Sequence, residues 1–274
     1  MTIGLRNRSV RSGQGAASVA RTVVTVLGLP AVLVALWWTV SDDSGSFYWP
    51  PLSEIIGSFR ETWFTGRFTE HVLPSLGRFA TGYGLALVLG IGLGVAIGSI
   101  RNLRATLEPV LEFFRAIPPP ILVPILMLFA GLGDGMKVLV IISGCVWPIL
   151  LNTVEGVRGI DEVLRDTAMS YQLGARRRLV HLVLRAASPH IAAGSRQALS
   201  IGLILMVISE MFAANNGLGF SIVQFQRSFA IPEMWTGIIL LGLIGVVLSL
   251  LYRIVESRLL AWYEGVRESQ RGEG

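Results

Sequence analysis

The residues with the most unusual chemistry lie in one basic stretch, RDTAMSYQLGARRRLVHLVLRAASPH, at positions 165–190. Small side chains at Thr167, Ala168 and Ser170 precede three consecutive arginines, and apolar residues recur at helical spacing throughout. This pattern predicts two short amphipathic helices hinged near Gly174. Because small side chains allow a second backbone to approach closely, we expect a contact with another protein. The alternative is that the arginines only set topology and bind anionic lipid headgroups.

Searches for catalytic and cofactor motifs find none. The only lysine, Lys137, is preceded by GLGDGM and followed by Val138, so the phosphate-binding G-x-x-x-x-G-K-[ST] loop is absent. The three histidines, His71, His181 and His190, lack metal-ligand spacing with carboxylates. No Ser/His/Asp arrangement or carboxylate pair shares a face. We therefore expect no enzymatic activity, and no metal or cofactor bound by this chain.

The composition indicates a membrane protein. Of 274 residues, 52% are hydrophobic and 15% charged, and the mean hydropathy is +0.62. The net charge of +5 could suggest nucleic acid, but the basic residues fall between apolar runs, where they act as topology signals. The single cysteine, Cys145, lies inside an apolar run and is expected to be a small buried side chain.

Six apolar runs approach the ~20 residues that are needed to cross ~30 Å of hydrocarbon. They lie at about 22–41, 79–100, 116–133, 138–154, 194–214 and 235–252. The expected fold class is therefore an all-α integral membrane protein with six transmembrane helices. The third run opens with prolines 118–120, so its first turn is expected to be extended or kinked. Gly90, Gly92, Gly94 and Gly98 in the second run predict close helix packing.

The arginines predict the orientation. Most of them lie before the first run, after the second, between the fourth and fifth, and after the sixth, which places both termini in the cytoplasm. The predicted organisation is a basic cytoplasmic tail over 1–21, one transmembrane domain over 22–254 that contains a cytoplasmic loop at 156–190, and a cytoplasmic tail over 255–274. The first run is expected to be a permanent anchor and not a cleaved signal peptide.

The external segment between the first two runs contains WPPLSEIIGSFRETWF. We expect a helix here that is capped by Ser53, with Ile55, Ile56, Phe59 and Trp63 on one face. A helix that lies on the outer membrane surface explains this pattern. A docking surface for an external partner is the alternative.

Single polar side chains near the spans are candidates for a translocation pathway. Glu210, near the outer end of the fifth run, either lines the pathway or forms a structural ion pair. Asn215 is a second candidate, although the segment 215–219 is more typical of a turn. Pro119 either shapes the pathway or forms a plain kink. Arg78 is expected to anchor its helix at the interface by reaching outward to water.

At the basic stretch the sequence resembles the permease subunits of bacterial ATP-binding-cassette importers, whose signature is E-A-A-x3-G-x9-I-x-L-P. Aligned without gaps, Asp166 takes the Glu position, Thr167 and Ala168 the two Ala positions, and Leu182 and Leu184 the Ile and Leu positions. Two positions depart from the signature, since Gln172 replaces the glycine and Arg185 the first proline. Gly174 can supply the glycine only if the register shifts by two residues.

Three further segments resemble the nitrate, sulfonate and taurine branch of these permeases, and the resemblance covers residues of about 50 to 260. They are PSLGRFATGYGLALVLGIGLGVAIG, LEPVLEFFRAIPPPILVPILMLFAGLG and SEMFAANNGLGF. The resemblance implies the type I (MetI-like) permease fold in the bacterial cytoplasmic, or inner, membrane. It also implies that the cytoplasmic loop couples to a separate ATPase subunit, through Asp166, Thr167, Ala168, Ser170, Gln172 and Gly174.

The partners that the resemblance implies are that ATPase subunit, a second permease subunit that is identical or different, an extracytoplasmic substrate-binding protein, and membrane lipid, with no nucleic acid. ATP and Mg would be bound by the ATPase, and none in this chain. The expected cargo is a small solute such as a sulfonate, nitrate, taurine, or a related organic anion or heterocycle. The alternative function is a self-sufficient secondary transporter, which should be built from two inverted halves, and no internal repeat is evident in the sequence.

Overall fold

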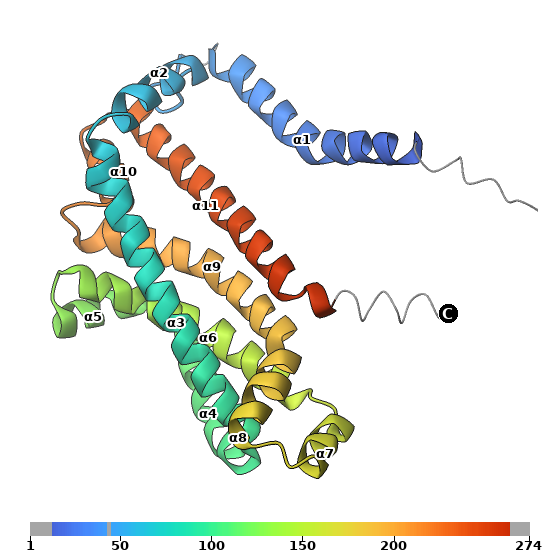
Figure 1. Ribbon diagram of the computed structural model, residues 1–274. Coiled ribbons are helices and arrows are strands. Elements are labelled where there is room, and N and C mark those ends of the chain that lie inside the picture. Colours follow the sequence, from blue (N-terminus) through green and yellow to red (C-terminus); the bar gives the residue numbers. More distant parts are fainter. Residues whose placement is uncertain (1–12, 43–44, 264–274) are drawn as a thin grey trace, which may run out of the picture.

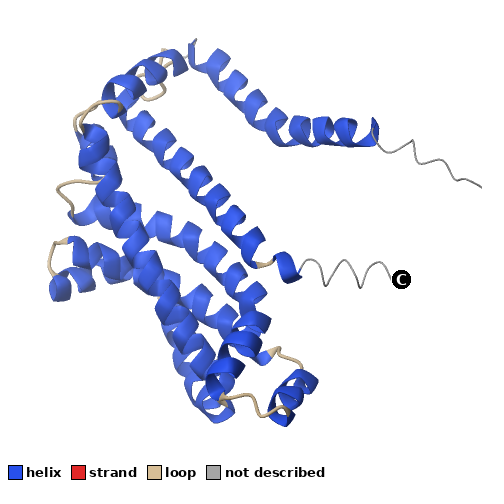
Figure 2. Ribbon diagram, in the orientation of Figure 1, coloured by secondary structure: helices blue, strands red, loops and turns tan. Residues whose placement is uncertain are grey.

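The computed structural model describes residues 13–42 and 45–263, and within these ranges the chain forms helices and short connections without a β-strand (Figures 1 and 2). The predicted all-α fold class is confirmed. The elements in chain order are α1 (Gly13–Asp42), α2 (Leu52–Trp63), η1 (Phe68–Val72), α3 (Leu73–Ser99), α4 (Arg101–Ala116), η2 (Pro119–Ile121), α5 (Leu122–Ala130), α6 (Asp134–Arg158), α7 (Glu162–Ser170), α8 (Ala175–Arg177), η3 (Arg178–Leu184), α9 (Arg185–Ala213), α10 (Leu218–Arg227) and α11 (Ile231–Leu259).

The centre of the bundle is formed by α3, α6 and α9, in which α6 packs extensively against both other helices and α3 touches α9 less (Figure 1). On α3, Gly90, Gly94 and Gly98 face α6. A β-carbon added at Gly94 would lie 2.5 Å from Thr153 Cβ, so the two backbones approach more closely than a larger residue would permit. The predicted packing role is confirmed for these three glycines. It is wrong for Gly92, which has no neighbouring atom within 4 Å of an added β-carbon.

The contact between α6 and α9 also depends on small residues. Cys145 is completely buried, and its Sγ lies 3.2 Å from the carbonyl oxygen of Ala198. A β-carbon added at Gly202 would lie 2.8 Å from the same sulfur. The prediction that Cys145 is a small buried side chain is confirmed.

Four helical segments are long and apolar enough to cross a membrane. They are Phe68–Ser99, Asp134–Arg158, Ala175–Phe212 and Ile231–Leu259, and they coincide with the second, fourth, fifth and sixth predicted spans. Each helix is longer than the apolar run that predicted it, because the helix continues into polar sequence at one or both ends. These segments confirm a membrane protein with several spanning helices.

The third predicted span is bent. Thr106–Ala116 and Pro119–Ala130 are long and apolar enough to cross a membrane only when they are taken together, and their axes differ by 74°. Ile117 and Pro118 between them have extended backbone, as the proline run predicts. Such a pair is either a broken span or a re-entrant loop.

The first predicted span, 22–41, falls within α1, of which Gly28–Asp42 is a shorter apolar segment. The count of six spans and the domain boundaries stay predictions. Residues 1–12 of the predicted N-terminal tail and 264–274 of the C-terminal tail lie outside the described residues. The helix α11 continues to Leu259, inside the predicted tail.

The helix α2 packs on the protein itself. It begins directly after Pro51, and Ser53 makes no capping hydrogen bond, so the predicted cap is wrong. Ile55 and Trp63 are 1% and 3% exposed, and Trp63 Nε1 donates to Thr236 Oγ1 of α11 at 2.9 Å. The apolar face that suggested a helix on the membrane surface is therefore largely covered by α11, and of its residues only Ile56 is exposed.

Three tryptophans connect α1 to the bundle. The rings of Trp37, Trp49 and Trp235 lie with centroids 5.2 to 5.5 Å apart, and Trp235 Nε1 donates to the carbonyl oxygen of Tyr48. Away from this cluster, α1 stands apart from the other helices (Figure 1).

The two ends of the bundle differ, and we name them after the elements found there. The α7 end carries the start of α9 and the end of α6, and the α10 end carries the start of α3 and the end of α9 (Figure 1). At the α7 end, α8, η3 and α9 follow one another without a break. The prediction of two short helices hinged near Gly174 is therefore wrong for the second one, which is the first part of a long helix.

Candidate functional site

The short helix α7 contains most of the predicted ATPase-contact residues. Asp161 precedes it and accepts a hydrogen bond from the N–H of Val163 at 2.8 Å, which satisfies one of the free amides of the first turn. The side chains of Asp166, Thr167 and Ser170 are exposed. The helix therefore presents these small polar side chains together with the exposed apolar residues Val163, Leu164 and Met169.

Ala168 faces the other way, because it is only 5% exposed. Arg165 Nη2 donates to the carbonyl oxygen of Val157 at the end of α6, at 2.6 Å. A groove of about 300 Å³ between α7 and the bundle is lined by residues that include Met169 and Leu182. Ala168 and Arg165 thus hold α7 against the bundle, and a direct contact of Ala168 with a partner is not supported by this arrangement.

The end of α7 places Gln172 in a conformation that is typical of glycine. Its φ is +51°, in the left-handed region. Gln172 N–H donates to Met169 O at 2.8 Å, and Leu173 N–H donates to Ala168 O at 3.1 Å. These two bonds form the Schellman motif, in which glycine is the usual residue at the left-handed position.

Gly174 has φ −59° and ψ 151°, which any residue adopts readily. In the ungapped register, the glycine position of the family signature falls on Gln172, where the backbone favours glycine. In the shifted register it falls on Gly174, where the backbone does not require glycine. Sequence reasoning identified the position, and the structure adds a physical reason for it.

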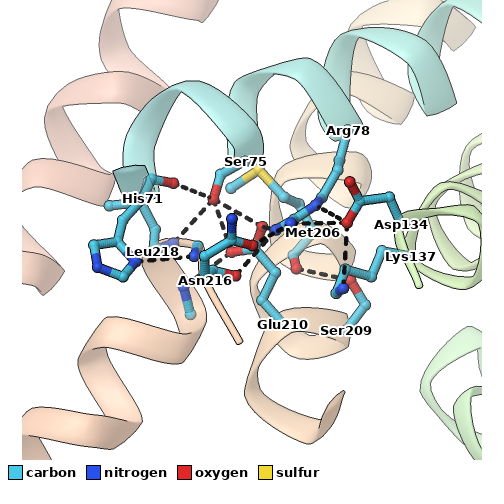
Figure 3. A network of polar contacts seen from close by, with 12 residues as sticks. His71, Ser75, Arg78, Asp134, Lys137, Met206, Ser209, Glu210, Asn216 and Leu218 are labelled. Atoms are coloured by element: carbon cyan, nitrogen blue, oxygen red, sulfur yellow. Dashed lines mark hydrogen bonds and ion pairs between the residues drawn. The ribbon is translucent and has the colours of Figure 1, made fainter. Parts of the chain in front are cut away.

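A buried polar network joins α3, α6, α9 and the turn before α10 (Figure 3). Arg78 is at its centre, with Nη1 2.7 Å from Glu210 Oε1 and Nε 2.8 Å from Asp134 Oδ1. The same guanidinium donates to the carbonyl and side-chain oxygens of Asn216. Lys137 Nζ lies 3.4 Å from Asp134 Oδ1. Two cations and two carboxylates therefore meet, so the buried charges are compensated.

Glu210 is satisfied on every side. Both of its oxygens lie within 2.9 Å of Ser75 Oγ, and the N–H of Gly219 donates to Oε2 at 3.0 Å. Leu218 N–H in turn donates to Ser75 Oγ at 2.9 Å. The carboxylate thus accepts the Gly219 N–H directly at the start of α10, where an anion is favoured, and Ser75 Oγ accepts the Leu218 N–H.

Gly217, in the turn between α9 and α10, has φ +123°. An added β-carbon there would lie 2.5 Å from Glu210 Cδ. The Gly217 N–H donates to His71 Nδ1 at 3.2 Å. Asn216 belongs to the same turn and binds Arg78. The predicted turn is confirmed for residues 215–217, whereas Leu218 and Gly219 already belong to α10.

The prediction for Arg78 is wrong. This side chain is 5% exposed and points into the network, not outward to water. Reaching outward was the expectation for an isolated cation, whereas Glu210 supplies a buried carboxylate and Asp134 a second, largely exposed one. The sequence did not indicate that Ser75, Asn216 and His71 belong to this network. The four charged residues at 78, 134, 137 and 210, which lie near the ends of apolar runs, were the signal that could have indicated a buried network.

The three candidate pathway residues have different surroundings. Glu210 has no exposed side-chain surface, which favours the structural ion pair over the pathway. Pro119 packs near Gly144 of α6. Asn215 is exposed and lines a cavity of about 530 Å³ at the α10 end. A pathway role for the three residues stays a prediction.

The lining of this cavity combines apolar and hydrogen-bonding side chains. Its residues are Leu132, Met211, Phe212, Ala214, Asn215, Phe220, Val223, Gln224, Arg227 and Ser228. The wall from 211 to 215 continues directly into the turn that the Arg78 network holds. The network therefore fixes the shape of the cavity rim.

The chain has clear relatives among characterised transport proteins. It is 28% identical to the taurine transport system permease protein of Escherichia coli (strain K12) over 91% of this chain and 93% of the relative. It is 27% identical to the nitrate import permease protein of Synechocystis sp. (strain PCC 6803) over 93% and 96%. It is 31% identical to the bicarbonate transport system permease protein of Synechococcus elongatus (strain PCC 7942) over 70% and 66%.

These relatives agree with the branch that the sequence motifs indicate. Residues 86–261 match the family described as binding-protein-dependent transport system inner membrane component, which is more than half of the chain. With its spanning helices, the exposed α7 and this match, the protein belongs to the binding-protein-dependent transport system inner membrane component family, as a permease subunit of an ATP-binding-cassette importer.

Proposed function

We propose that this permease subunit forms part of a pathway for a small solute with an oxyanion group, which an external binding protein delivers and a separate ATPase drives. The observation that carries the proposal is the form of α7. It is a capped helix that is exposed on the outside and fixed to α6 on the inside. A short helix held in this way transmits a push to the bundle as a rigid body.

The expected orientation puts α7 in the cytoplasm and the α10 end outside. An ATPase subunit would then contact the exposed face of α7, with Asp166, Thr167 and Ser170 at the contact and Gln172 closing the helix. Arg165 and Ala168 would carry the movement to α6 and α9. ATP and Mg would be bound by that ATPase, and a second permease subunit would complete the pathway.

The cavity at the α10 end supports an oxyanion as the solute. Arg227, Gln224 and Asn215 place hydrogen-bond donors around it. Guanidinium groups bind oxyanions through charge-assisted hydrogen bonds. Taurine, nitrate and bicarbonate, for which the relatives are named, all carry an oxygen-rich acidic group. A sulfonate or a planar oxyanion therefore fits this cavity better than a cation does.

The test is co-purification of an ATPase subunit with the tagged, detergent-solubilised permease from its native membranes. The exposed residue Asp166 is replaced by Asp166→Lys, which reverses a charge on α7 without disturbing a buried contact. The matched control is Glu112→Lys on the exposed face of α4. We expect the ATPase to be lost only from Asp166→Lys. Loss from both variants, or from neither, would leave α7 without a coupling role, and failure to recover any ATPase with wild type would favour the secondary transporter.

A further inference from the structure

A groove between α9 and α11 has no part in the coupling helix or in the Arg78 network. It has a volume of about 310 Å³. Its walls are similar, because each helix supplies one arginine, one serine and one leucine. These are Arg196, Leu199 and Ser200 on α9, and Ser249, Leu250 and Arg253 on α11, which also supplies Tyr252.

The direction of the helices decides how these residues are layered. α9 runs away from the α7 end and α11 runs back toward it (Figure 1). Arg196 precedes Ser200 by one turn, and Arg253 follows Ser249 by one turn. Both arginines therefore lie toward the α7 end, and both serines lie one turn deeper along the bundle.

The groove is closed on its α7 side. Tyr252 Oη donates to the carbonyl oxygen of Ala192 at 2.7 Å, and Arg196 forms an ion pair with Glu256. Tyr252 and Arg196 line the groove themselves, and their partners Ala192 and Glu256 lie about one turn nearer the α7 end. These two contacts therefore bridge α9 and α11 on the α7 side of the groove.

The charge of the groove is positive. Arg196 keeps 62% of its side chain exposed although it pairs with Glu256. Arg253 makes no ion pair within the described part of the chain. Two guanidiniums and one carboxylate give a net charge of +1, which favours an anion.

The surface that leads out of the groove is apolar. Leu243, Val246 and Val247 lie on the same side of α11 as Leu250, at helical spacing, and all four are 52 to 57% exposed. A ligand that fills the groove therefore needs an anionic end and a long apolar end.

We propose that this groove binds the phosphate headgroup of one anionic phospholipid from the leaflet at the α7 end. Arg196 and Arg253 hold the phosphate oxygens, the two serines lie at the depth of the glycerol esters, and an acyl chain runs along Leu250 and Val246. Basic pockets between transmembrane helices are suited to anionic headgroups, and guanidinium pairs with phosphate in a bidentate manner. Bound in this way, the lipid fills the space between α9 and α11.

The test is native mass spectrometry of the full-length permease, purified with its partners and titrated with phosphatidylglycerol or phosphatidylcholine. The variant is Arg253→Gln, chosen because Arg196 is needed to compensate Glu256. The matched control is Arg258→Gln, which removes the same charge from the exposed end of α11 outside the groove. We expect Arg253→Gln to bind phosphatidylglycerol roughly fivefold more weakly, with binding unchanged for Arg258→Gln and for phosphatidylcholine.

A second variant, Ser249→Phe, fills the groove without a change of charge and should also lose phosphatidylglycerol. Adding inorganic phosphate distinguishes binding of a lipid headgroup from binding of free phosphate. We expect it neither to raise the melting temperature nor to displace the lipid. Equal losses in Arg253→Gln and Arg258→Gln, retention of lipid by both groove variants, or equal stabilisation by inorganic phosphate would each overturn the proposal. None of these results depends on whether the chain couples to an ATPase.

Discussion

Arg78 Nη1 lies 2.7 Å from Glu210 Oε1, and the two side chains are 5% and 0% exposed although 132 residues separate them in the chain. This ion pair fixes the start of α3 to the end of α9, and through Asn216 and Gly219 it also fixes the turn that leads into α10. The Arg78–Glu210 pair therefore helps to hold the rim of the cavity at the α10 end, together with the other contacts of the network.

The first prediction concerns this ion pair. Arg78→Met leaves the Glu210 carboxylate buried without its cation, which should destabilise the protein by about 3–5 kcal/mol. The double variant Arg78→Met with Glu210→Met removes both charges and should recover part of the loss. Thermal unfolding of the detergent-solubilised protein measures both effects.

The control is the exposed ion pair between Arg115 and Glu112, whose side chains are 54% and 53% exposed. Arg115→Met should cost at most about 1 kcal/mol, because exposed ion pairs are screened by water. Similar losses for Arg78→Met and Arg115→Met would show that the buried network does not stabilise the bundle.

The second prediction concerns the contact of α3 with α6. Gly94→Ala forces the helices apart, since the new β-carbon meets both Thr153 Cβ at 2.5 Å and the backbone oxygen of Leu150 at 2.9 Å. We expect a loss of about 1–3 kcal/mol. Gly92→Ala has free space around it and should stabilise the helix by about 0.5–1 kcal/mol. A lower melting temperature for Gly92→Ala than for Gly94→Ala would contradict the packing described here.

The third prediction concerns the end of α7. Gln172→Gly removes a side chain from a left-handed residue with φ +51° and should stabilise the cap by about 1 kcal/mol. Amide hydrogen exchange of the segment 162–174 should then slow about fivefold. Gly174→Ala should not speed exchange, because φ −59° suits alanine. Faster exchange in Gln172→Gly would be incompatible with the Schellman geometry.

The fourth prediction concerns orientation. Met169 and Phe64 are 57% and 80% exposed, whereas the only cysteine, Cys145, is fully buried. The cysteines introduced by Phe64→Cys and Met169→Cys should therefore react with a maleimide much faster than Cys145 does. In intact cells a membrane-impermeant maleimide should label the Phe64→Cys variant only, and in inverted membrane vesicles the Met169→Cys variant only. The reverse pattern would place α7 outside and exclude its contact with a cytoplasmic ATPase.

Part of this architecture could be predicted from sequence because it depends on local spacing. Gly90, Gly94 and Gly98 recur every fourth residue, which keeps them on one face of a helix. Gly92 lies two residues from its neighbours and points to the opposite side, so the spacing itself separates it from the packing set. The kink after α4 was predictable for the same reason, because proline restricts its own backbone and that of the residue before it.

The buried network could not be assembled from sequence. A cationic side chain at the end of an apolar run can avoid an uncompensated buried charge in two ways. It can extend to water, or it can pair with a buried carboxylate. Only the fold brings Glu210 and Asp134 to Arg78. The length of the helix that begins at Ala175 was missed for another reason. Its first residues are basic and polar, so hydropathy marked only the later part as a span.

The most direct test of the central claim is a photo-crosslink from α7. A benzophenone maleimide attached to the cysteine of a Met169→Cys variant, in the complete transporter in native membranes, should form an adduct with the ATP-binding-cassette ATPase subunit. The same probe on a Phe64→Cys variant should form no such adduct, since residue 64 is expected on the opposite side of the membrane. An ATPase adduct specific to residue 169 is the result that we expect. Crosslinks from residue 169 to lipid or to other proteins, without any ATPase adduct, would contradict the assignment of α7 as the coupling element.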